Sequence, residues 1–446
     1  MKKTLFRMNA LQTLALGFGV IILLGTLLLS LPVSNRSGEF FPFVDALFTA
    51  ASATCVTGLV VVDTYVNFTF FGQLVILLLI QIGGLGFMTI AVMFAMLLRR
   101  RIGLKERSNL KEAINSIQLG GVVRLTKRIL IGTGLLETLG AILLAIRFIP
   151  RFGILQGIWF AIFHSVSAFC NAGFDLMGAI APYASLTPFV SDALVNLVVI
   201  VLIVLGGLGF IVWNDVIEHK WHISKYLLHT KIMLRATLGI IVVSAGLFLA
   251  FEWNGGFAGM EVGDKILAAL FCAVTPRTAG FNTVDVRTLS QAGSLLTMSL
   301  MIIGAGPGST AGGIKLTTFV VMILTTISYI RGREDINVAN RRLESETIRK
   351  SFSFGGLYAS FAFLGALSLL ALENFPFHDT IFEVLSAIGT VGLSRGITAA
   401  LSGISKGILV SLMYVGRVGS LSVAMAFIEQ KQARGLRNPV EKIIIG

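Results

Sequence analysis

Ala53-Thr54-Cys55-Val56-Thr57-Gly58-Leu59 is the stretch around which the whole chain is organised. The fairly apolar segment before it, residues 41–54, is shorter than the roughly 20 residues that a membrane-spanning helix needs. Long apolar runs flank it, at 11–31 and 70–98. Irregular backbone is tolerated at membrane depth only where protein buries it or where it lines a watery path. The stretch therefore predicts a re-entrant loop beside such a path.

The same pattern occurs four times along the chain. The other copies are Ser167-Ala168-Phe169-Cys170-Asn171-Ala172-Gly173-Phe174, Ala273-Val274-Thr275-Pro276-Arg277-Thr278-Ala279-Gly280-Phe281 and Ser386-Ala387-Ile388-Gly389-Thr390-Val391-Gly392-Leu393. Their glycines lie 115, 107 and 112 residues apart, counted from Gly58. A regular period is an architectural signal. We expect four units: pore repeat 1 at 1–100, pore repeat 2 at 101–220, pore repeat 3 with a broken inner helix at 221–335, and pore repeat 4 with a cytoplasmic tail at 336–446.

The composition is that of a polytopic membrane protein. Of the 446 residues, 55% are hydrophobic and only 13% are charged, whereas a soluble domain carries about 25% charged residues. Mean hydropathy is +0.86. The 48 glycines suit closely packed transmembrane helices. The three cysteines lie in or just before the predicted turns and show no metal-like pairing, so we interpret them as small packing residues.

The net charge of +13 reflects topology rather than nucleic-acid binding. Of the 36 lysines and arginines, 26 fall in five stretches: 2–7, 99–128, 220–235, 331–350 and 431–442. Clustering of this kind follows the positive-inside rule. It places these stretches, and with them both termini, on the cytoplasmic side of the cell membrane. The basic start followed by the apolar run 11–31 resembles a signal peptide, but the run is too long, so we take it as the first span.

These patterns predict an all-α polytopic fold of parallel repeats, each made of an outer helix (M1), a pore loop and an inner helix (M2). We expect outer helices at 11–32, 128–149, 232–252 and 351–372, pore helices at 41–53, 155–168, 263–275 and 379–388, and inner segments at 70–99, 190–213, 294–330 and 406–428. Every repeat starts and ends inside. The arrangement gives eight spans with pseudo-fourfold symmetry around one ion pore.

The third inner segment is expected to be broken. Its ten residues Gly304-Ala305-Gly306-Pro307-Gly308-Ser309-Thr310-Ala311-Gly312-Gly313 contain five glycines and a proline, which disfavour a helix. The flanks predict two half-helices, 294–303 and 314–330. A loop at mid-membrane needs a cavity or protein partners for its backbone. We interpret it as a gate loop under the pore turns, with a plain hinge as the alternative. The other inner helices carry glycines at similar places, Gly83, Gly206 and Gly416, which let helices approach closely or bend. Close packing alone also explains the first two.

The four turns predict a potassium selectivity filter made of backbone carbonyls. A bare cation crosses only where something replaces its hydration shell, and rings of carbonyls do this for K⁺. Turns that point carbonyls inward need unusual backbone angles, which glycine adopts at little cost. The candidate filter residues are Thr54, Cys55, Val56, Thr57, Gly58, Cys170, Asn171, Ala172, Gly173, Arg277, Thr278, Ala279, Gly280, Gly389, Thr390, Val391 and Gly392. Their side chains differ between repeats, so only the backbone can be the shared ligand.

Two cationic side chains lie at membrane depth, where an ionisable residue is a functional hypothesis by default. Arg417 is mid-way along the fourth inner segment and would place a positive charge on the cation path. The alternative is a structural pairing with a carbonyl or with an acid such as Glu137. Lys315, directly after the gate loop, either acts similarly or binds lipid or a partner at the cytoplasmic end.

Three acids follow the filter glycines closely: Asp63, Asp175 and Asp285. Facing the outer mouth, they would concentrate cations by the local potential. Solvated surface acids or helix caps are the alternative. His164, in the second pore helix, is interpreted as a packed histidine rather than a ligand.

At these residues the chain resembles the Ktr/Trk/HKT superfamily of potassium transporters. The match spans the four pore repeats, one glycine per filter, the 304–313 loop and Arg417. Because the first span already opens repeat one, the chain looks most like a membrane subunit of the Ktr type. Some plant members carry serine at the first filter glycine and prefer sodium; retention of Gly58 therefore implies potassium.

The resemblance further implies a homodimer with one pore per subunit, and a cytosolic nucleotide-binding regulatory ring of the KtrA type that opens the gate. The basic segments 99–128, 331–350 and 431–442 are candidate docking surfaces. The chain lacks a G-x-x-x-x-G-K-[ST] motif, so nucleotide would act through the partner. We expect K⁺ as the transported ion, Na⁺ as a possible activator, no covalent cofactor and no nucleic acid.

Other classes of function fit the sequence less well. An alternating-access cation symporter usually shows inverted repeats with paired broken helices, and only one break is expected here. An intramembrane enzyme needs a nucleophile–base pair or metal ligands at membrane depth, and no H-E-x-x-H motif is present. The sequence therefore predicts a K⁺-translocating subunit and no enzyme.

Overall fold

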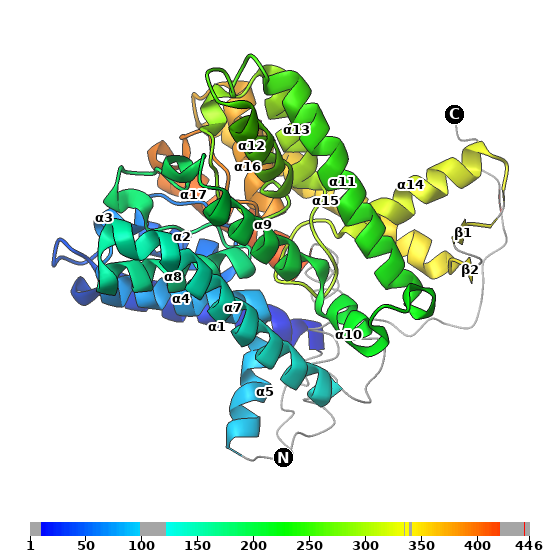
Figure 1. The fold of residues 1–446 in the computed structure, drawn as a ribbon, viewed down its shortest axis with the longest axis horizontal. Helices are drawn as coiled ribbons and strands as arrows, with labels where there is room; N and C mark the ends of the chain where they lie inside the picture. Colours follow the sequence, from blue (N-terminus) through cyan, green and yellow to red (C-terminus); the bar gives the residue numbers. More distant parts are fainter. Residues whose placement is uncertain (1–9, 99–121, 334, 339–340, 420–440, 442–446) are drawn as a thin grey trace.

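The computed structural model describes residues 10–98, 122–333, 335–338, 341–419 and 441. Within them the regular secondary structure is helical apart from one small antiparallel pair, β1(Asn337–Val338) and β2(Arg341–Arg342). Single helical turns lie at 32–34, 64–67 (α3), 177–179, 187–189, 223–225, 286–288 and 398–400. Figure 1 shows the helices as one bundle with the loops at its centre.

Four helices of the described part are long and apolar enough to cross a membrane. They are α1(Ala10–Ser30), α7(Val122–Phe152), α11(Leu228–Glu252) and α15(Ser345–Leu372). Each matches a predicted outer helix. Their leucine and isoleucine side chains are largely exposed, as expected of surfaces that face lipid.

Four shorter helices point into the centre of the bundle: α2(Phe43–Thr54), α8(Ile154–Phe169), α12(Val262–Val274) and α16(Phe377–Gly389). Pro42 and Pro376 directly precede two of them, where a missing N–H costs nothing. Asp45, Asp264 and Asp379 lie in first turns, where a negative charge suits the helix dipole. All four helices end at the predicted turns.

Four further helices follow the turns and begin in one way. They are α4(Phe70–Leu85), α9(Ala193–Leu208), α13(Gln291–Ile302) and α17(Gly403–Val418). A side-chain oxygen of the preceding residue accepts an N–H of the first turn in each: Thr69 from Gly72, Asp192 from Val195, Ser290 from Gly293, and Ser402 from Ser405. Such caps fix where a helix starts.

The prediction of unbroken inner helices at 70–99 and 190–213 is wrong. The first is interrupted at Gly86, which separates α4 from α5(Phe87–Leu97), and the second at Gly209, which separates α9 from α10(Phe210–His219). The two glycines have φ values of +80° and +97°, which terminate a right-handed helix. The α9–α10 bend is 94°. The fourth inner helix ends at Val418, before Gly419 (φ +97°), and the rest of the predicted 406–428 lies outside the described residues.

The third inner segment is split between α13 and α14(Leu316–Ile330), as the composition of 304–313 predicts. Two backbone bonds close the base of the intervening loop. Gly304 donates to the Ile314 carbonyl at 2.9 Å, and Leu316 donates to the Ala305 carbonyl at 2.9 Å. The loop therefore leaves and re-enters the helical layer at one place.

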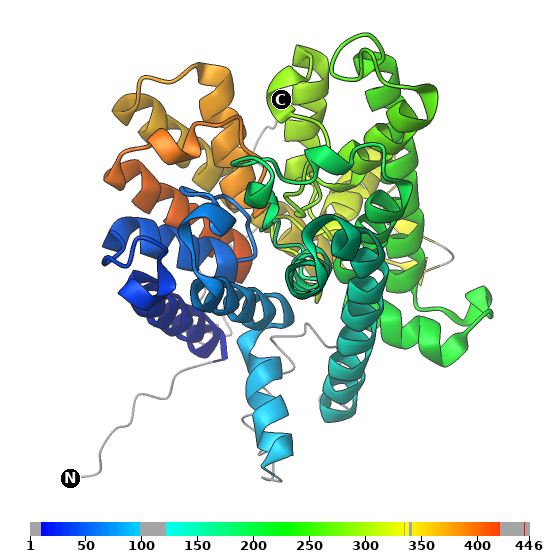
Figure 2. The same ribbon diagram turned by 60° about the vertical axis from the view of Figure 1, so that its left-hand side comes forward.

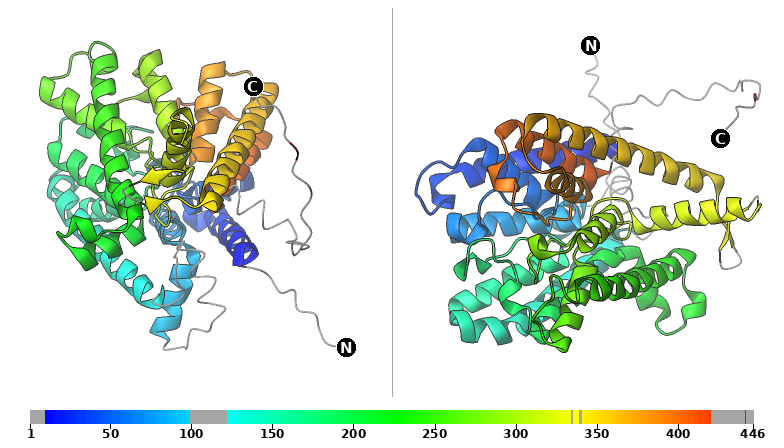
Figure 3. Two further views of the ribbon diagram at one scale, coloured as in Figure 1. Left: turned by 90° about the vertical axis from the view of Figure 1, so that its right-hand side faces the viewer. Right: turned by 90° about the horizontal axis from the view of Figure 1, so that it is seen from above.

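The contacts between the inner helices and the short helices form a closed ring. Each inner helix packs against the short helix of the next unit: α4 on α8, α9 on α12, α13 on α16, and finally α17 on α2. The first and last quarters of the chain are thus neighbours, and in Figure 2 the blue, teal, green and orange segments surround a common centre. The views in Figure 3 show the same grouping from two other directions.

The described helices that are long and apolar enough to cross a membrane are fewer than the eight predicted spans. Besides the four long helices, the bent pair α9–α10 makes at most a fifth candidate in the described residues. The shorter apolar helices include α4, α13 and α14, because the inner segments are interrupted. The eight-span arrangement stays a prediction.

Candidate functional site

The four turns share one unusual backbone conformation. Each filter glycine has positive φ: Gly58 +92°, Gly173 +70°, Gly280 +82° and Gly392 +92°. The residue two positions earlier does too, although it is not glycine: Val56 +57°, Asn171 +57°, Thr278 +76° and Thr390 +51°. Positive φ is uncommon outside glycine and most strained for β-branched residues. Its recurrence at the same place in four segments indicates a conformation that the surrounding structure imposes.

The turns touch one another in a closed cycle. A Cβ added to a filter glycine would meet the carbonyl oxygen that precedes the glycine of the next turn. On Gly58 it would lie 2.5 Å from the Ala172 oxygen, on Gly173 2.8 Å from that of Ala279, on Gly280 2.6 Å from that of Val391, and on Gly392 it would overlap the Thr57 oxygen. These positions admit only glycine without movement of a neighbouring backbone. Four segments spread over 335 residues therefore converge at the centre of the fold.

Hydroxyl side chains of the short helices hold the turns. Ser52 accepts the Gly58 N–H at 3.1 Å, and Ser386 accepts the Gly392 N–H at 3.1 Å. Ser167 donates to the Phe174 carbonyl at 2.7 Å. Sequence reasoning missed these serines. All three lie six residues before a filter glycine, so the repeat alignment itself carries the signal.

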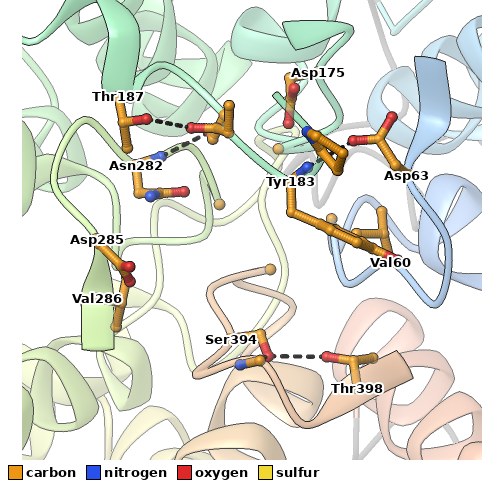
Figure 4. A pocket seen from close by; sticks show the side chains of 18 of the residues that line it. Val60, Asp63, Asp175, Tyr183, Thr187, Asn282, Asp285, Val286, Ser394 and Thr398 are labelled. Carbon is orange, nitrogen blue, oxygen red and sulfur yellow. Dashed lines mark hydrogen bonds between the residues drawn. The ribbon is translucent and has the colours of Figure 1, made fainter. Parts of the chain in front are cut away.

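The four filter glycines open into one outer cavity of about 590 Å³. Asp63, Asp175 and Asp285 line it, as Figure 4 shows, together with Tyr183 and Asn282. The acids are not free. Asp63 accepts backbone N–H groups of Val66 (2.9 Å) and Tyr183 (2.8 Å), Asp175 accepts that of Met177 (2.8 Å), and Asp285 pairs with Arg287 (2.7 Å). These acids therefore accept N–H groups in turns or pair with a cation, and they also face the cavity, while their concentration of cations there stays a prediction.

Several predicted filter side chains are buried without a partner. In the described part of the chain, the hydroxyls of Thr54, Thr57, Thr278 and Thr390 and the Nε of Arg277 have no hydrogen bond. Buried polar groups are normally satisfied, so each such atom needs an explanation. Cys55 and Cys170 are fully buried and not disulfide-bonded, and the Cys170 thiol donates to Gln81 Oε1 at 3.5 Å.

The loop 304–313 is embedded in protein. Its backbone pairs with the break of the second inner helix: Gly306 N–H with the Gly207 carbonyl at 2.8 Å, and Phe210 N–H with the Gly308 carbonyl at 2.9 Å. The Thr310 hydroxyl donates to the Phe169 carbonyl at 3.1 Å, at the end of α8. Gly312 abuts the Thr390 side chain of the fourth turn. The loop is therefore wedged between filter turns and inner helices.

Arg417 joins the loop to the first inner helix. Its guanidinium donates to the carbonyls of Thr310, Gly83 (2.5 Å) and Gly84 (3.0 Å). Arg417 therefore pairs with backbone carbonyls, and the alternative prediction that it pairs with Glu137 is wrong. Glu137 instead accepts Gln81 Nε2 at 3.2 Å and lies 3.9 Å from Cys170 Sγ.

Lys315 is partly buried and turns back onto the loop that precedes it. Its Nζ donates to the Ala311 carbonyl at 2.7 Å and lies 3.5 Å from that of Gly312. Together, Arg417 and Lys315 engage three consecutive loop carbonyls, at 310, 311 and 312. His164 is fully buried, with Nδ1 2.7 Å from the Phe160 carbonyl and Nε2 accepting Leu176 N–H, which confirms a packed histidine.

The fold and these contacts define a helical membrane protein whose chain closes around four glycine turns. Comparison with known proteins agrees. A family model described as "TrkH: Cation transport protein" matches residues 7–435. The Ktr system potassium uptake protein B of Bacillus subtilis is 41% identical over 437 residues, covering 98% of this chain and 96% of that protein. The potassium/sodium uptake protein NtpJ of Enterococcus hirae is 38% identical, covering 100% and 99%.

A solved structure shares the fold. The potassium transporter TrkH from Vibrio parahaemolyticus superimposes with a TM-score of 0.75 at 19% identity, over 96% of this chain and 86% of that chain. The chain belongs to the TrkH family of cation transport proteins. The chain is accordingly a membrane protein. Its resemblance to the Ktr/Trk/HKT superfamily is confirmed.

Proposed function

We propose that this chain is the translocating subunit of a Ktr-type potassium uptake system, with a single pore through the closed cycle of filter glycines. The cycle is the observation that carries the proposal, because each glycine lies against the preceding carbonyl of its neighbour. Alternation of left-handed and ordinary residues turns successive carbonyls toward one side. Four such strands around one axis offer K⁺ the oxygen cage that replaces its water. Pseudo-fourfold symmetry and eight spans belong to this proposal.

Charge around the pore supports cation passage. The short helices α2, α8, α12 and α16 end at the turns, so the negative ends of their dipoles face the centre. At the outer side, Asp63, Asp175 and Asp285 line the cavity above the glycines. The unpaired hydroxyls of Thr57, Thr278 and Thr390 are explained if water or the ion is their partner.

The loop 304–313 acts as the gate in this proposal. It lies against the fourth turn through Gly312 and is tied to the inner helices by Arg417. Opening requires that the bonds of Arg417 to Thr310 and to Gly83 and Gly84 no longer be made together. The positive charges of Arg417 and Lys315 oppose entry of a cation while the loop is in place.

The resemblance supplies the wider assembly: a homodimer, a cytosolic nucleotide-binding ring that drives the gate, and Na⁺ as a possible activator. The termini are cytoplasmic in this assembly. Most of the predicted docking segments 99–128 and 431–442 lie outside the described residues, whereas 341–350 is described and includes the exposed start of α15. NtpJ carries both potassium and sodium in its name, so ion choice has to be measured.

One observation favours a second candidate, an alternating-access cation symporter. Interrupted inner helices are a feature of such carriers, and the inner helices here are interrupted at Gly86 and Gly209 as well as at 304–313. In the proposal the repeats are nevertheless parallel, because the basic stretches between them predict that each repeat starts and ends on the cytoplasmic side. Flux separates the two, since a carrier moves few ions per conformational cycle.

The test is ⁸⁶Rb⁺ uptake into proteoliposomes that hold only this chain, driven by an internal K⁺ gradient. We compare the wild type with a variant that lacks residues 308–311. External K⁺ should block uptake and Na⁺ should block it poorly, and the deletion should raise basal uptake. Equal competition by Na⁺ would contradict the proposal that the turns form a potassium-selective filter. Unchanged uptake by a folded deletion variant would contradict the proposal that the loop is the gate. Flux that saturates at carrier-like rates in the deletion variant would favour the symporter.

A further inference from the structure

The turn between α10 and α11 forms a projecting tip at one end of the molecule. The chain bends by 94° between α9 and α10, so α10 runs across the direction of the inner helix. Figure 1 shows α10 at the end of α11 that is far from α12. If α9 follows the membrane normal, α10 lies in the plane of the membrane surface.

This tip, residues 217–227, displays large apolar side chains. Trp221 is 94% exposed, and Ile223, Ile217 and Leu227 are 63%, 60% and 46% exposed. Large contiguous apolar patches are rare on surfaces that meet water and mark contact sites. Tryptophan in particular concentrates where a bilayer meets water.

Hydrogen bonds within the fold hold the tip in the conformation that exposes these apolar side chains. Asp215 is 3% exposed and holds both ends of the tip: Oδ1 pairs with His219 Nδ1 at 2.9 Å, and Oδ2 accepts the Leu227 N–H at 2.9 Å. Lys231 Nζ donates to the Ser224 carbonyl at 2.8 Å. The backbone that carries Trp221 and Ile223 is therefore fixed from both sides.

The length of α11 places the tip at headgroup level. Its 25 residues extend roughly 37 Å at 1.5 Å per residue, more than the roughly 30 Å of hydrocarbon. Trp253 caps the opposite end, with Lys265 Nζ 4.4 Å from its ring centroid. An aromatic and basic pair at each end is the arrangement of a helix whose ends both reach an interface. The tip joins the end that starts at Leu228.

The charge of the tip selects the kind of lipid. Within the tip Lys220 and Lys225 are exposed, against one exposed acid, Glu218, and the nearby Asp215 is buried and engaged. We propose that residues 217–227 bind anionic phospholipid headgroups, with Trp221 and Ile223 inserted at the boundary of the acyl chains and the lysines on the phosphates. The tip then anchors the junction of the second inner helix with α11, next to the loop that Phe210 contacts.

Fluorescence tests the insertion. The full chain is reconstituted in vesicles of phosphatidylcholine and phosphatidylglycerol with bromine at a shallow or a deep acyl position. The signal of Trp221 is the difference between the wild type and Trp221→Phe, and Trp253→Phe gives the matched difference for the other leaflet. Shallow bromine should quench Trp221 more than deep bromine. If aqueous iodide quenches Trp221 and bromine at neither depth does, the proposal is overturned.

Lipid binding tests the charge. Native mass spectrometry measures the ratio of phosphatidylglycerol to phosphatidylcholine retained by the detergent-extracted protein. Lys220→Gln together with Lys225→Gln should lower this ratio on the order of tenfold at the site, whereas Glu346→Gln with Lys350→Gln, an exposed pair elsewhere, should leave it unchanged. An unchanged ratio in the first variant overturns the choice of anionic lipid. Shielding of Trp221 only after addition of soluble cytosolic protein would assign the tip to a protein partner instead.

Discussion

The guanidinium of Arg417 donates to the carbonyl of Gly84 at 3.0 Å, across 333 residues of sequence. A second donor of the same side chain reaches Thr310 in the gate loop. The positively charged side chain of Arg417 is thus hydrogen-bonded to carbonyls at the centre of the bundle, next to the filter turns. In the proposed function this position serves both gating and conduction, which makes Arg417 the first residue to change.

Arg417→Ala should raise basal ⁸⁶Rb⁺ uptake at least about tenfold. A single hydrogen bond to a charged group contributes about 1.5–3 kcal/mol, and a change of about 1.4 kcal/mol in the open–closed balance is tenfold. Arg417→Lys should lie between, since a lysine cannot reach three carbonyls in the same fork. Arg147→Ala is the control, because Arg147 is half exposed and pairs with Asp192 away from the loop. Uptake at the wild-type level in well-folded Arg417→Ala would show that this residue does not hold the gate.

Gly280→Ser should reduce selectivity for Rb⁺ over Na⁺. A Cβ there would lie 2.6 Å from the Val391 carbonyl oxygen, in addition to the strain of φ +82°. Gly259→Ser is the matched control, since Gly259 has φ +78° but nothing within 4 Å of the added Cβ. It shares the strain without the contact. Equal selectivity in both variants would mean that the close approach of the turns has no part in ion choice.

Gly312→Ala should impair uptake through Thr390. The added methyl group would overlap the Thr390 hydroxyl and lie 2.9 Å from its Cγ2, in the fourth filter turn. Thr390→Ala removes both atoms and should restore uptake in the double variant. The measurement is the initial uptake rate of the two single variants and the double variant. A double variant no better than Gly312→Ala would show that loop and filter are not coupled through this contact.

Lys406 and Asp45 should stabilise the junction of the last and first quarters of the chain. Their N–O distance is 2.7 Å, and their side chains are 12% and 22% exposed. A double-mutant cycle with Lys406→Gln and Asp45→Asn should give a coupling of about 1 kcal/mol, at the upper end for ion pairs. Thermal unfolding in detergent measures it. Lys350 and Glu346, more than half exposed, should give almost none; equal couplings would contradict the argument.

The sequence predicts the turns well because they depend on local chemistry. A glycine at each repeat position is needed where φ is positive and a neighbouring backbone is close, and Gly58, Gly173, Gly280 and Gly392 all meet both conditions. The break at 304–313 follows equally from its own composition. The long outer helices follow from apolar length.

What the sequence could not settle depends on distant partners. A single glycine in an apolar run costs a helix only about 1 kcal/mol, so Gly86 and Gly209 could not be distinguished from packing glycines. The contact of Phe210 with Gly308, about a hundred residues away, accompanies the second break. Likewise, nothing local decides whether Arg417 meets a carbonyl or Glu137.

The contact between Gly392 and Thr57 has a consequence for biosynthesis. Synthesis proceeds from the N-terminus, so the first turn is made long before the residue that completes its surroundings. Until about the last eighth of the polypeptide has been made, the first and the third turn each lack one neighbouring turn. Irregular backbone without a protein partner is costly in lipid. A nascent chain stalled before Gly392 should therefore be unstable and a target for membrane proteolysis. In the proposed function, ion permeability should accordingly appear only once the fourth turn has completed the cycle.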